Sequence, residues 1–394
     1  MPDAAAPQSE PIHLRLQQVA ARLEARFLGR DEAIRALLVS VIAGEHLALI
    51  GPPGTAKSAL VRAFSKATSA RFFEYLLTRF TEPSELFGPV DIAAFRTGDY
   101  RRRTEGMLPE AELVFLDEIF KSSSAILNAL LTLLNERTFI AGGRATKAPI
   151  LSVVGASNEV PTDGDLAAIF DRFLLRVRTT QLDAIHFRAL LSRGWRAEMM
   201  ADEPVEEGPL VTADELRQAR RALGTQTSID EAFIATYRGL VLQLRAEGVA
   251  LSDRRVVKLL RLCAASALLD GRTQLDDGDL WVLRHVWGTE DQISIVEGIV
   301  EPVLEAHLRE HPEARRIGAA RVGLPAIAAE IERVRAALSA GPVLTDVQLF
   351  AQLKVLGELK TALAPMREAE ARALGEQIDA LLEAAMRGGR LGAL

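Results

Sequence analysis

The sequence predicts an α/β protein, in which a parallel sheet flanked by helices is followed by two segments that are almost wholly helical. Two short apolar runs, LALI at 47–50 and LVFL at 113–116, each lead into polar residues. In an open parallel sheet, buried strands are apolar and end in polar residues at the edge where ligands bind. Beyond residue 180, apolar residues recur at helical spacing. These patterns predict a sheet-based core with helical additions.

The bulk composition of the 394-residue chain predicts a cytoplasmic protein of two or three domains. Apolar residues make up 48%, enough for a sizeable core. No apolar run approaches the roughly eighteen residues of a membrane-spanning helix, and the N-terminus lacks the pattern of a signal peptide. The only cysteine, Cys263, lies in an apolar helical stretch and can form no internal disulfide. The net charge of −6 argues against a dedicated nucleic-acid-binding protein.

The first apolar run leads directly into GPPGTAKS at 51–58, which predicts a phosphate-binding loop. Small residues at Gly51, Gly54 and Ala56 let successive backbone N–H groups point at a phosphate chain. Lys57 places a cation near the outer phosphates, and the Ser58 hydroxyl is the expected Mg²⁺ ligand. Ala56 replaces the second glycine of the usual pattern, and its methyl group is tolerated if that backbone needs no positive φ.

The second apolar run ends in two acids, in LVFLDE at 113–118. At the end of a parallel strand, Asp117 is expected to hold Mg²⁺ through its water shell. Glu118 is placed to orient and polarise a water molecule for in-line attack on a γ-phosphate. Taken alone, the two acids could cap the following helix. Together with GPPGTAKS they predict nucleotide binding and hydrolysis.

The remaining core elements are assigned from the same patterns. A helix is expected over about 10–44 and another over 122–136, and strands at 46–50, 72–77, 113–118, 151–158 and 174–179. Two inserted hairpins are predicted between them. The first covers about 88–106, with Thr97-Gly98-Asp99 as a turn between two short strands. The second covers 138–150, with a turn at Gly142-Gly143.

Beyond residue 180, helices are expected at 181–195, 212–223, 227–247, 253–270 and 276–287, with a flexible acidic connection at 200–210. We therefore divide the chain into an α/β core (1–180), a helical domain (181–290) and a C-terminal helical segment (291–394). In the last segment, apolar positions from Ile327 to Leu363 predict a helical hairpin or small bundle. The apolar positions of this segment are explained if its helices pack against one another. The alternative is that they dock to a partner.

The order of these elements resembles that of an AAA+ ATPase over about residues 10–290. More narrowly, GPPGTAKS, VFLDEIF, NALLTLLNERTF, GASNEVP and FDRF resemble the MoxR family. FLGRDEAIRALL, LTRFTEPSELFGPV, LPEAELVFLDEIFK, SDRR and LRHVWG resemble its RavA branch. The resemblance implies a P-loop AAA+ core with a helical lid that binds ATP and Mg²⁺. RavA-type proteins also carry a small β-rich domain that binds a lysine decarboxylase. No comparable strands are predicted here, so that partner is not expected.

The resemblance also implies roles for single residues. Asn158 matches the first sensor, whose amide can hydrogen-bond the γ-phosphate and the attacking water; the alternative is a turn asparagine. Arg172 matches the arginine finger that one subunit gives to its neighbour, and a local salt bridge to Asp171 is the alternative. Arg254 matches the second sensor, and the adjacent Arg255 is the alternative for the same role.

Leu28, Gly29 and Arg30 fall where the family closes over the adenine. The expected nucleotide contacts are Leu28, Gly29, Arg30, Pro53, Gly54, Thr55, Ala56, Lys57, Ser58 and Ala59. The expected metal ligands are Ser58 and Asp117. The expected catalytic residues are Glu118, Asn158, Arg172 and Arg254.

If Arg172 acts in trans, the active site exists only between subunits, and a closed ring, a hexamer as in the family, is expected. The favoured function is a chaperone-like ATPase that remodels or activates a partner protein, with a von Willebrand factor A domain protein as co-chaperone. The alternatives are a motor on DNA or RNA and a nucleotide-switched assembly scaffold.

The first inserted segment is the predicted contact with the substrate. Its four arginines, Arg96 and Arg101–Arg103, interleave with Phe95 and Tyr100. They could grip an acidic polypeptide or a nucleic-acid strand. Pairing with the acids of the same segment on a solvated face is the alternative.

Overall fold

The computed structural model describes residues 10–161, 164–182, 208–312, 324–339, 345–363 and 369–387, together with residues 190, 191 and 195. They belong to two compact units. The first is Met1–Thr180 with Glu206–Ile317, and the second is Gln181–Val205 with Gly318–Leu394. Most of the helix expected at 181–195 and of the acidic connection at 200–210 lies outside the described residues.

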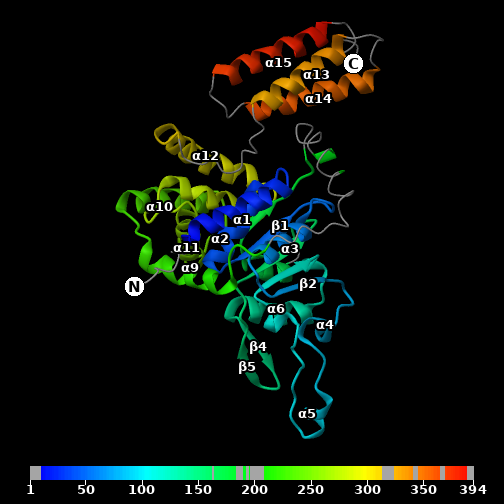
Figure 1. Cartoon of the computed structure of the whole chain (residues 1–394), viewed down its shortest axis with the longest axis vertical. Helices are drawn as coiled ribbons and strands as arrows, with labels where there is room; N and C mark the ends of the chain where they lie inside the picture. Colours follow the sequence, from blue (N-terminus) through cyan, green and yellow to red (C-terminus); the bar gives the residue numbers. More distant parts are fainter. Residues whose placement is uncertain are drawn as a thin grey trace, which may run out of the picture. The chain divides into compact units, whose positions relative to one another are not determined.

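A five-stranded parallel sheet in the order β2–β3–β6–β1–β7 forms the centre of the first unit (Figure 1). Its strands are β1 (His46–Ile50), β2 (Phe72–Leu76), β3 (Leu113–Asp117), β6 (Ser152–Ser157) and β7 (Phe173–Arg178). Strands β1 and β6 are buried along their whole length, because the sheet is covered on both faces. The predicted α/β fold with a parallel-sheet core is confirmed.

The helix expected over 10–44 is two helices, α1 (Ile12–Arg26) and α2 (Asp31–Ala43). Gly29, with a φ of 62°, lies in the break between them. The left-handed Gly44 ends α2 and turns the chain into β1. Further helices of the core are α3 (Lys57–Ala67), α6 (Ser124–Glu136) and α7 (Gly164–Phe170), with single 3₁₀ turns η1 (Leu108–Glu110) and η2 (Ile119–Lys121).

The imidazole of His46 ties three core elements together at the amino end of β1. The backbone N–H of Val153 in β6 donates to its Nδ1 at 3.0 Å. This bond leaves the proton on Nε2, which donates to the Leu134 carbonyl of α6 at 3.0 Å. The pKa of His46 is lowered to about 3, mainly by burial and also by the nearby Arg137, against the raising effect of the Leu134 bond.

A pH dependence of stability follows from His46. Since its folded-state pKa is below the unfolded value, the unfolded chain binds the proton first, and the free energy of unfolding falls as the pH drops from about 6.5 toward 3. The expected slope from this group is at most about 1.4 kcal/mol per pH unit. Urea unfolding of the parent and His46→Asn between pH 7 and 4.5 measures it, and the variant should show the shallower slope. His13→Asn is the matched control. Equal slopes in the parent and His46→Asn would contradict a neutral buried imidazole.

The first inserted segment differs from the predicted hairpin. The structure has α4 (Pro83–Phe87), a helical turn α5 (Ile92–Arg96) and one antiparallel bridge, Val90 to Arg102, in place of two strands. The reason is local, because the Asp91 carboxylate accepts from the N–H groups of Ala93 and Ala94 and caps a helical turn. The second insert is the predicted hairpin, β4 (Thr138–Ala141) paired with β5 (Arg144–Lys147). Figure 1 shows both inserts projecting from the same end of the unit.

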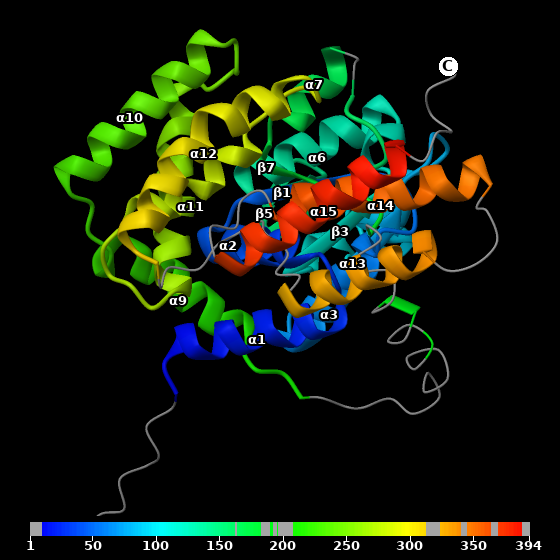
Figure 2. The ribbon, with the colours of Figure 1, turned by 90° about the horizontal axis from the view of Figure 1, so that it is seen from above.

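Helices complete the first unit. They are α9 (Ala213–Gln226), α10 (Glu231–Ala246), α11 (Asp253–Leu269), the 3₁₀ segment η3 (Asp277–His285) and α12 (Gln292–Glu310). Figure 2 shows α10, α11 and α12 gathered together. Thr212, Asp230 and Ser252 cap the first three of these helices, each accepting from a backbone N–H of the first turn.

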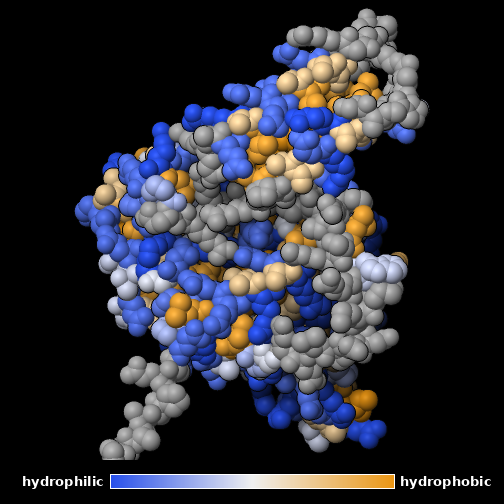
Figure 3. Space-filling view, turned by 45° about the horizontal axis from the view of Figure 1, so that its top comes forward, coloured by the Kyte–Doolittle hydropathy of each residue, from blue (hydrophilic) through white to orange (hydrophobic). Residues whose placement is uncertain are grey.

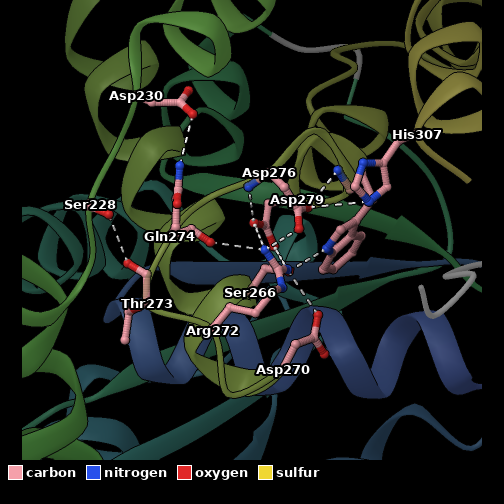
Figure 4. A network of polar contacts seen from close by, with 12 residues as sticks. Ser228, Asp230, Ser266, Asp270, Arg272, Thr273, Gln274, Asp276, Asp279 and His307 are labelled. Atoms are coloured by element: carbon pink, nitrogen blue, oxygen red, sulfur yellow. Dashed lines mark hydrogen bonds and ion pairs between the residues drawn. The ribbon is translucent and has the colours of Figure 1, made fainter. Parts of the chain in front are cut away.

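A buried polar network fixes η3 against its neighbours (Figure 4). Arg272 donates from Nη2 and Nη1 to the two carboxylate oxygens of the fully buried Asp279, at 2.7 and 2.9 Å. Asp270 bridges this arginine to Arg35 of α2, which donates to its carboxylate at 2.6 Å. The bidentate pair gives η3 a set position, and the Arg35 contact joins it to the core.

The first unit extends beyond the predicted boundary at 290/291. Helix α12 packs on η3, where Val296 and Val300 are buried. In the second unit, α13 (Leu324–Ser339), α14 (Asp346–Leu363) and α15 (Ala369–Arg387) share a separate apolar core that includes Ile327, Ile331 and Leu356. The predicted C-terminal helical segment is therefore present.

Candidate active site

The loop between β1 and α3 has the geometry of a phosphate-binding cradle. Gly51 can only be glycine, because a Cβ there would lie 1.9 Å from the Thr179 carbonyl oxygen. The backbone N–H groups of residues 54–59 have no protein acceptor among the described residues. Lys57 Nζ donates to the carbonyls of Gly51 at 2.6 Å and Pro52 at 2.9 Å. A row of unsatisfied donors next to a lysine, at a helix N-terminus, suits a phosphate chain.

Ala56 adopts the left-handed conformation, with φ 63° and ψ 23°. The condition under which the sequence tolerated this methyl group, a backbone without a positive φ, is therefore not met. The loop must turn its N–H groups inward just before α3 begins, and this requires the backbone that glycine usually supplies. An alanine pays a steric cost of about 1–2 kcal/mol here.

Replacing Ala56 by glycine is expected to raise the free energy of unfolding by about 1 kcal/mol, because the strain of the methyl group is removed. The matched control is Ala63→Gly, in the middle of α3, where the same change should lower stability by about 1 kcal/mol. Urea unfolding of both variants measures the two effects. Destabilisation by both would show that the Ala56 backbone is not strained.

The acids predicted from the second strand lie at the end of β3. Glu118 is also left-handed, with φ 51°, and its N–H donates to the Asp117 carboxylate at 3.0 Å. Asn158, just beyond β6, donates from Nδ2 to Glu118 Oε1 at 2.6 Å. Lys121 Nζ lies 3.2 Å from the same oxygen. Glu118 Oε2 is buried without a partner, so it is the oxygen that can accept a proton from a water molecule.

Lys121 is the contact that sequence reasoning missed. Its only signal is the spacing of three residues from Glu118 across a turn, which places the two side chains on one side. Asn158 holds the carboxylate of Glu118, and its contact with a γ-phosphate stays a prediction. The structure therefore brings Asn158 and Glu118 together in a single hydrogen-bonded pair.

The junction of α1 and α2 lies beside the phosphate-binding loop. Arg30 donates to the carbonyl of Thr55 at 3.1 Å and to that of Thr180, past the end of β7, at 2.7 Å. These bonds place Leu28 and Gly29, which precede it, next to the loop. Burial lowers the pKa of Arg30. The three residues predicted around the adenine therefore lie next to the predicted phosphate contacts.

Arg172 lies at the opposite edge of the sheet from the phosphate-binding loop. It immediately precedes β7, whose first residue, Phe173, is paired with His46 at the start of β1, whereas the loop follows the other end of β1. Five residues of strand span about 16 Å. Arg172 therefore does not reach the loop of its own chain.

Three arginines surround the Asp171 carboxylate. Arg255 Nη1 lies 2.8 Å from it, Arg172 3.8 Å and Arg176 3.9 Å. Arg255 is buried and also donates to the Ala250 carbonyl at 2.9 Å. The shortest contact belongs to Arg255, and Arg172 makes only a long ion pair with Asp171. The Arg172 side chain is 33% exposed, and its Nε has no hydrogen-bond partner in the described part of the chain.

The two candidates for the second sensor have different surroundings. Arg255 is held by Asp171, as described, and its guanidinium is buried. Arg254, one residue earlier in the first turn of α11, is exposed. Arg254 is therefore the one of the two arginines that Asp171 does not hold.

A match to two family models decides the family. Residues 14–221 match the model described as the MoxR domain in the MoxR–vWA–β-propeller ternary systems, and residues 233–300 match an AAA lid domain. The chain belongs to the MoxR family of AAA+ ATPases. The resemblance inferred from the sequence is thereby confirmed at the family level, while the RavA branch stays a prediction.

Relatives from archaea and bacteria agree with this family. An uncharacterized protein of Methanocaldococcus jannaschii is 37% identical over 278 residues, 70% of this chain and 72% of the relative. Protein MoxR of Paracoccus denitrificans is 31% identical over 42% of this chain and 50% of its own length. The chaperone MoxR1 of Mycobacterium tuberculosis is 24% identical over 51% of this chain and 54% of its own length.

A solved structure has the same fold. It is a protein of Cytophaga hutchinsonii, provisionally named an ATPase, which superposes with a TM-score of 0.59 at 20% identity. The match covers 74% of this chain and 94% of that one. Membership of an ATPase family indicates nucleotide binding, and the unsatisfied N–H groups of residues 54–59 fit that ligand.

Proposed function

We propose that this MoxR-family chain hydrolyses ATP in a ring of identical subunits and uses the cycle to remodel or activate a partner protein. One observation carries the proposal. The phosphate-binding loop, Asp117, and the Glu118–Asn158 pair all follow the carboxyl ends of neighbouring strands β1, β3 and β6. In an open parallel sheet this edge is where ligands bind.

The chain's own groups supply the steps of hydrolysis. The N–H groups of residues 54–59 bind the phosphates, and Lys57 leaves the carbonyls of Gly51 and Pro52 to contact the outer ones. Ser58 and Asp117 would hold Mg²⁺, which would supply positive charge to neutralise the phosphates. Glu118 orients the attacking water through Oε2, while Asn158 fixes the carboxylate through Oε1.

The remaining roles require a second subunit and the lid. Because Arg172 lies a strand's length from its own loop, we assign it to the active site of a neighbour, which makes a ring, a hexamer as in the family, the expected assembly. Arg254 is assigned as the second sensor because Arg255 is occupied by Asp171. Residues 1–180 are assigned to the nucleotide-binding core, the helices from α9 to the end of α12 at Glu310 to the lid, and α13 to α15 to the C-terminal helical segment.

The two inserts are the proposed contact with the partner protein. Near α5, Ile92 is 65% exposed and Phe95 is 60% exposed, and Ile140 of the hairpin is 56% exposed. In Figure 3 the coloured part at the lower right carries apolar atoms among hydrophilic ones. Exposed apolar residues at a projecting tip are typical of an interaction surface. The family model that the chain matches is described from systems with a vWA protein, which supports a von Willebrand factor A domain partner.

A motor acting on nucleic acid is the second candidate. A cavity of about 440 Å³ between the inserts is lined by Arg71, Arg101, Arg102, Arg144 and Lys147, together with Tyr100 and Phe139. Cations beside aromatic rings can bind a single strand by phosphate contact and stacking. Part of this charge is already paired, since Asp99 lies 2.5 Å from Arg101 and 3.7 Å from Arg144. The acidic net charge also favours a protein partner.

Two measurements on the purified chain test this function. Phosphate release from ATP should occur and should rise with protein concentration more steeply than in proportion, because sites form only between subunits. Single-stranded DNA, double-stranded DNA and RNA, added at low salt, should neither bind the chain nor accelerate phosphate release. A von Willebrand factor A domain protein encoded beside this chain should bind it and accelerate phosphate release. No phosphate release contradicts the ATPase, and stimulation by nucleic acid alone favours the motor.

No helix in the described part of the chain is both long and apolar enough to cross a membrane. We place the protein in the cytoplasm, in keeping with its single, buried cysteine and its use of ATP.

A further inference from the structure

A cavity of about 700 Å³ lies between α9 and α11 in the first unit. Arg217, Arg220 and Arg221 of α9 and Arg261 of α11 line it, and its described lining contains no acidic side chain. Three of the arginines are spaced i, i+3 and i+4, so they lie on one face of α9. The proposed ATPase site makes no use of them.

The cavity lies at the opposite edge of the sheet from the phosphate-binding loop. A Cβ on Gly44, which precedes β1, would lie 2.4 Å from Arg220 Cζ, so the guanidinium rests on this glycine. The loop begins at Gly51, after the last residue of β1. The two places are therefore separated by about the 16 Å length of the strand.

The positive charge at this cavity is only partly neutralised. Arg217 is paired with Asp214 at 2.6 Å and Glu112 at 2.5 Å. Arg261 lies 3.5 Å from Glu45, which already pairs with a lysine of α11 at 2.6 Å. For Arg220 and Arg221, no hydrogen bond or ion pair is found within the part of the chain that the structure describes.

The surroundings of Arg220 add further positive charge. Arg137 donates to the carbonyl of Gly44, and the Arg220 guanidinium packs where a Cβ of that glycine would lie. Burial first, and the charge of Arg261 next, lower the pKa of Arg220, while the carboxylate of Glu45 partly offsets this by raising it. Burial and the charge of Arg220 likewise lower the pKa of Arg137, to about 10. Half-buried cations that repel one another are stabilised by a bound anion.

We propose that this cavity binds a small molecule that carries two or more phosphate groups. Guanidinium groups match phosphate oxygens in bidentate geometry, and arginines from two facing helices can hold more than one phosphate. Leu223, Ile229, Leu260 and Ala264 give the same cavity an apolar surface suited to a ring such as a nucleobase. Its volume lies within the range of small-molecule sites. An extended acidic peptide would exceed it.

Calorimetry with inorganic tripolyphosphate tests the site. The full chain carries Lys57→Ala throughout, so that the phosphate-binding loop contributes little, and the buffer contains about 0.15 M salt to screen non-specific attraction. Saturable binding near one per chain is expected. Arg221→Glu should weaken it roughly tenfold or more, since a charge-assisted hydrogen bond is lost and a repulsive charge is added. Arg221 is exposed and unpaired within the described residues, so this variant should fold.

Two further variants make the result specific. Arg220→Gln should weaken binding to a similar extent, with circular dichroism and thermal melting as checks of the fold. Arg238→Glu makes the same charge change on an exposed arginine of α10, outside the cavity, and should leave the affinity unchanged. Tripolyphosphate should also raise the melting temperature of the Lys57→Ala chain and of Arg238→Glu, but not of Arg221→Glu.

Three results would overturn the proposal. One is the absence of tripolyphosphate binding in the Lys57→Ala background. Another is a loss of tripolyphosphate affinity in Arg238→Glu equal to that in Arg221→Glu, which would indicate general charge attraction. The third is displacement of tripolyphosphate by a glutamate-rich peptide that binds more tightly, which would assign the cavity to a polypeptide. Because Lys57 is absent from every variant, none of these results bears on the proposed ATPase function.

Discussion

Glu118→Gln is expected to bind ATP as the parent does and to hydrolyse it roughly 10² to 10⁴ times more slowly. The amide keeps the size of the side chain and the acceptor that faces Asn158, but it cannot take a proton from the water molecule at the position of Oε2. Phosphate release at saturating ATP measures the loss, and equilibrium titration with labelled ATP measures the affinity. Glu105→Gln, in the first insert, is the matched control and should retain full turnover.

The outcome of the Glu118 experiment also separates the chaperone-like ATPase from a nucleotide-switched scaffold. A scaffold needs binding and assembly but little turnover, so Glu118→Gln would still support function in the cell. A remodelling ATPase needs repeated cycles, so the variant should be inactive in the cell although it assembles normally. Unchanged phosphate release in Glu118→Gln would remove this residue from the mechanism altogether.

Arg172→Ala is expected to lower ATP turnover by roughly 10³-fold or more, with nucleotide affinity retained. The reason is geometric, because Arg172 precedes β7 at the edge of the sheet opposite its own loop and can act only on a neighbour's γ-phosphate. Phosphate release at high protein concentration measures the loss. The control is Arg238→Ala, which removes an exposed arginine of α10 and should leave ATP turnover unchanged.

Mixing two inactive variants tests the trans arrangement directly. Arg172→Ala subunits retain Lys57, and Lys57→Ala subunits retain Arg172, so a mixed ring contains some complete sites. Turnover should therefore reappear when the two are combined before ATP is added. Mixed assemblies that form normally and remain inactive would argue against an intersubunit site, as would full turnover in Arg172→Ala alone.

The sheet and the phosphate-binding loop were predictable because their signals are local. GPPGTAKS and LVFLDE each combine a buried strand with the polar residues that follow it, and periodicity places such segments well. Helices α9, α10 and α11 were found for the same reason. Their capping residues, Thr212, Asp230 and Ser252, stand directly before apolar residues at helical spacing.

The failures have tertiary or conformational causes. Thr97-Gly98-Asp99 was a correct turn signal, but Asp91 caps a helical turn before it, and one bridge replaced the expected pair of strands. The left-handed backbone at Ala56 was indicated only by the glycine that the usual pattern has at this position, because alanine itself seldom adopts it. The pairing of Asp171 with Arg255 spans 84 residues, and no local pattern could show which of two adjacent arginines is buried.

Calorimetric titration of the parent chain and Lys57→Ala with Mg·ATP is the most direct test of the central claim, that the loop after β1 binds a nucleoside triphosphate. The donors of residues 54–59 and the ammonium group of Lys57 should give the parent a saturable heat of binding. Lys57→Ala should lose most of it while keeping the parent's circular dichroism spectrum. No heat with the parent, or identical titrations of parent and variant, would contradict this claim.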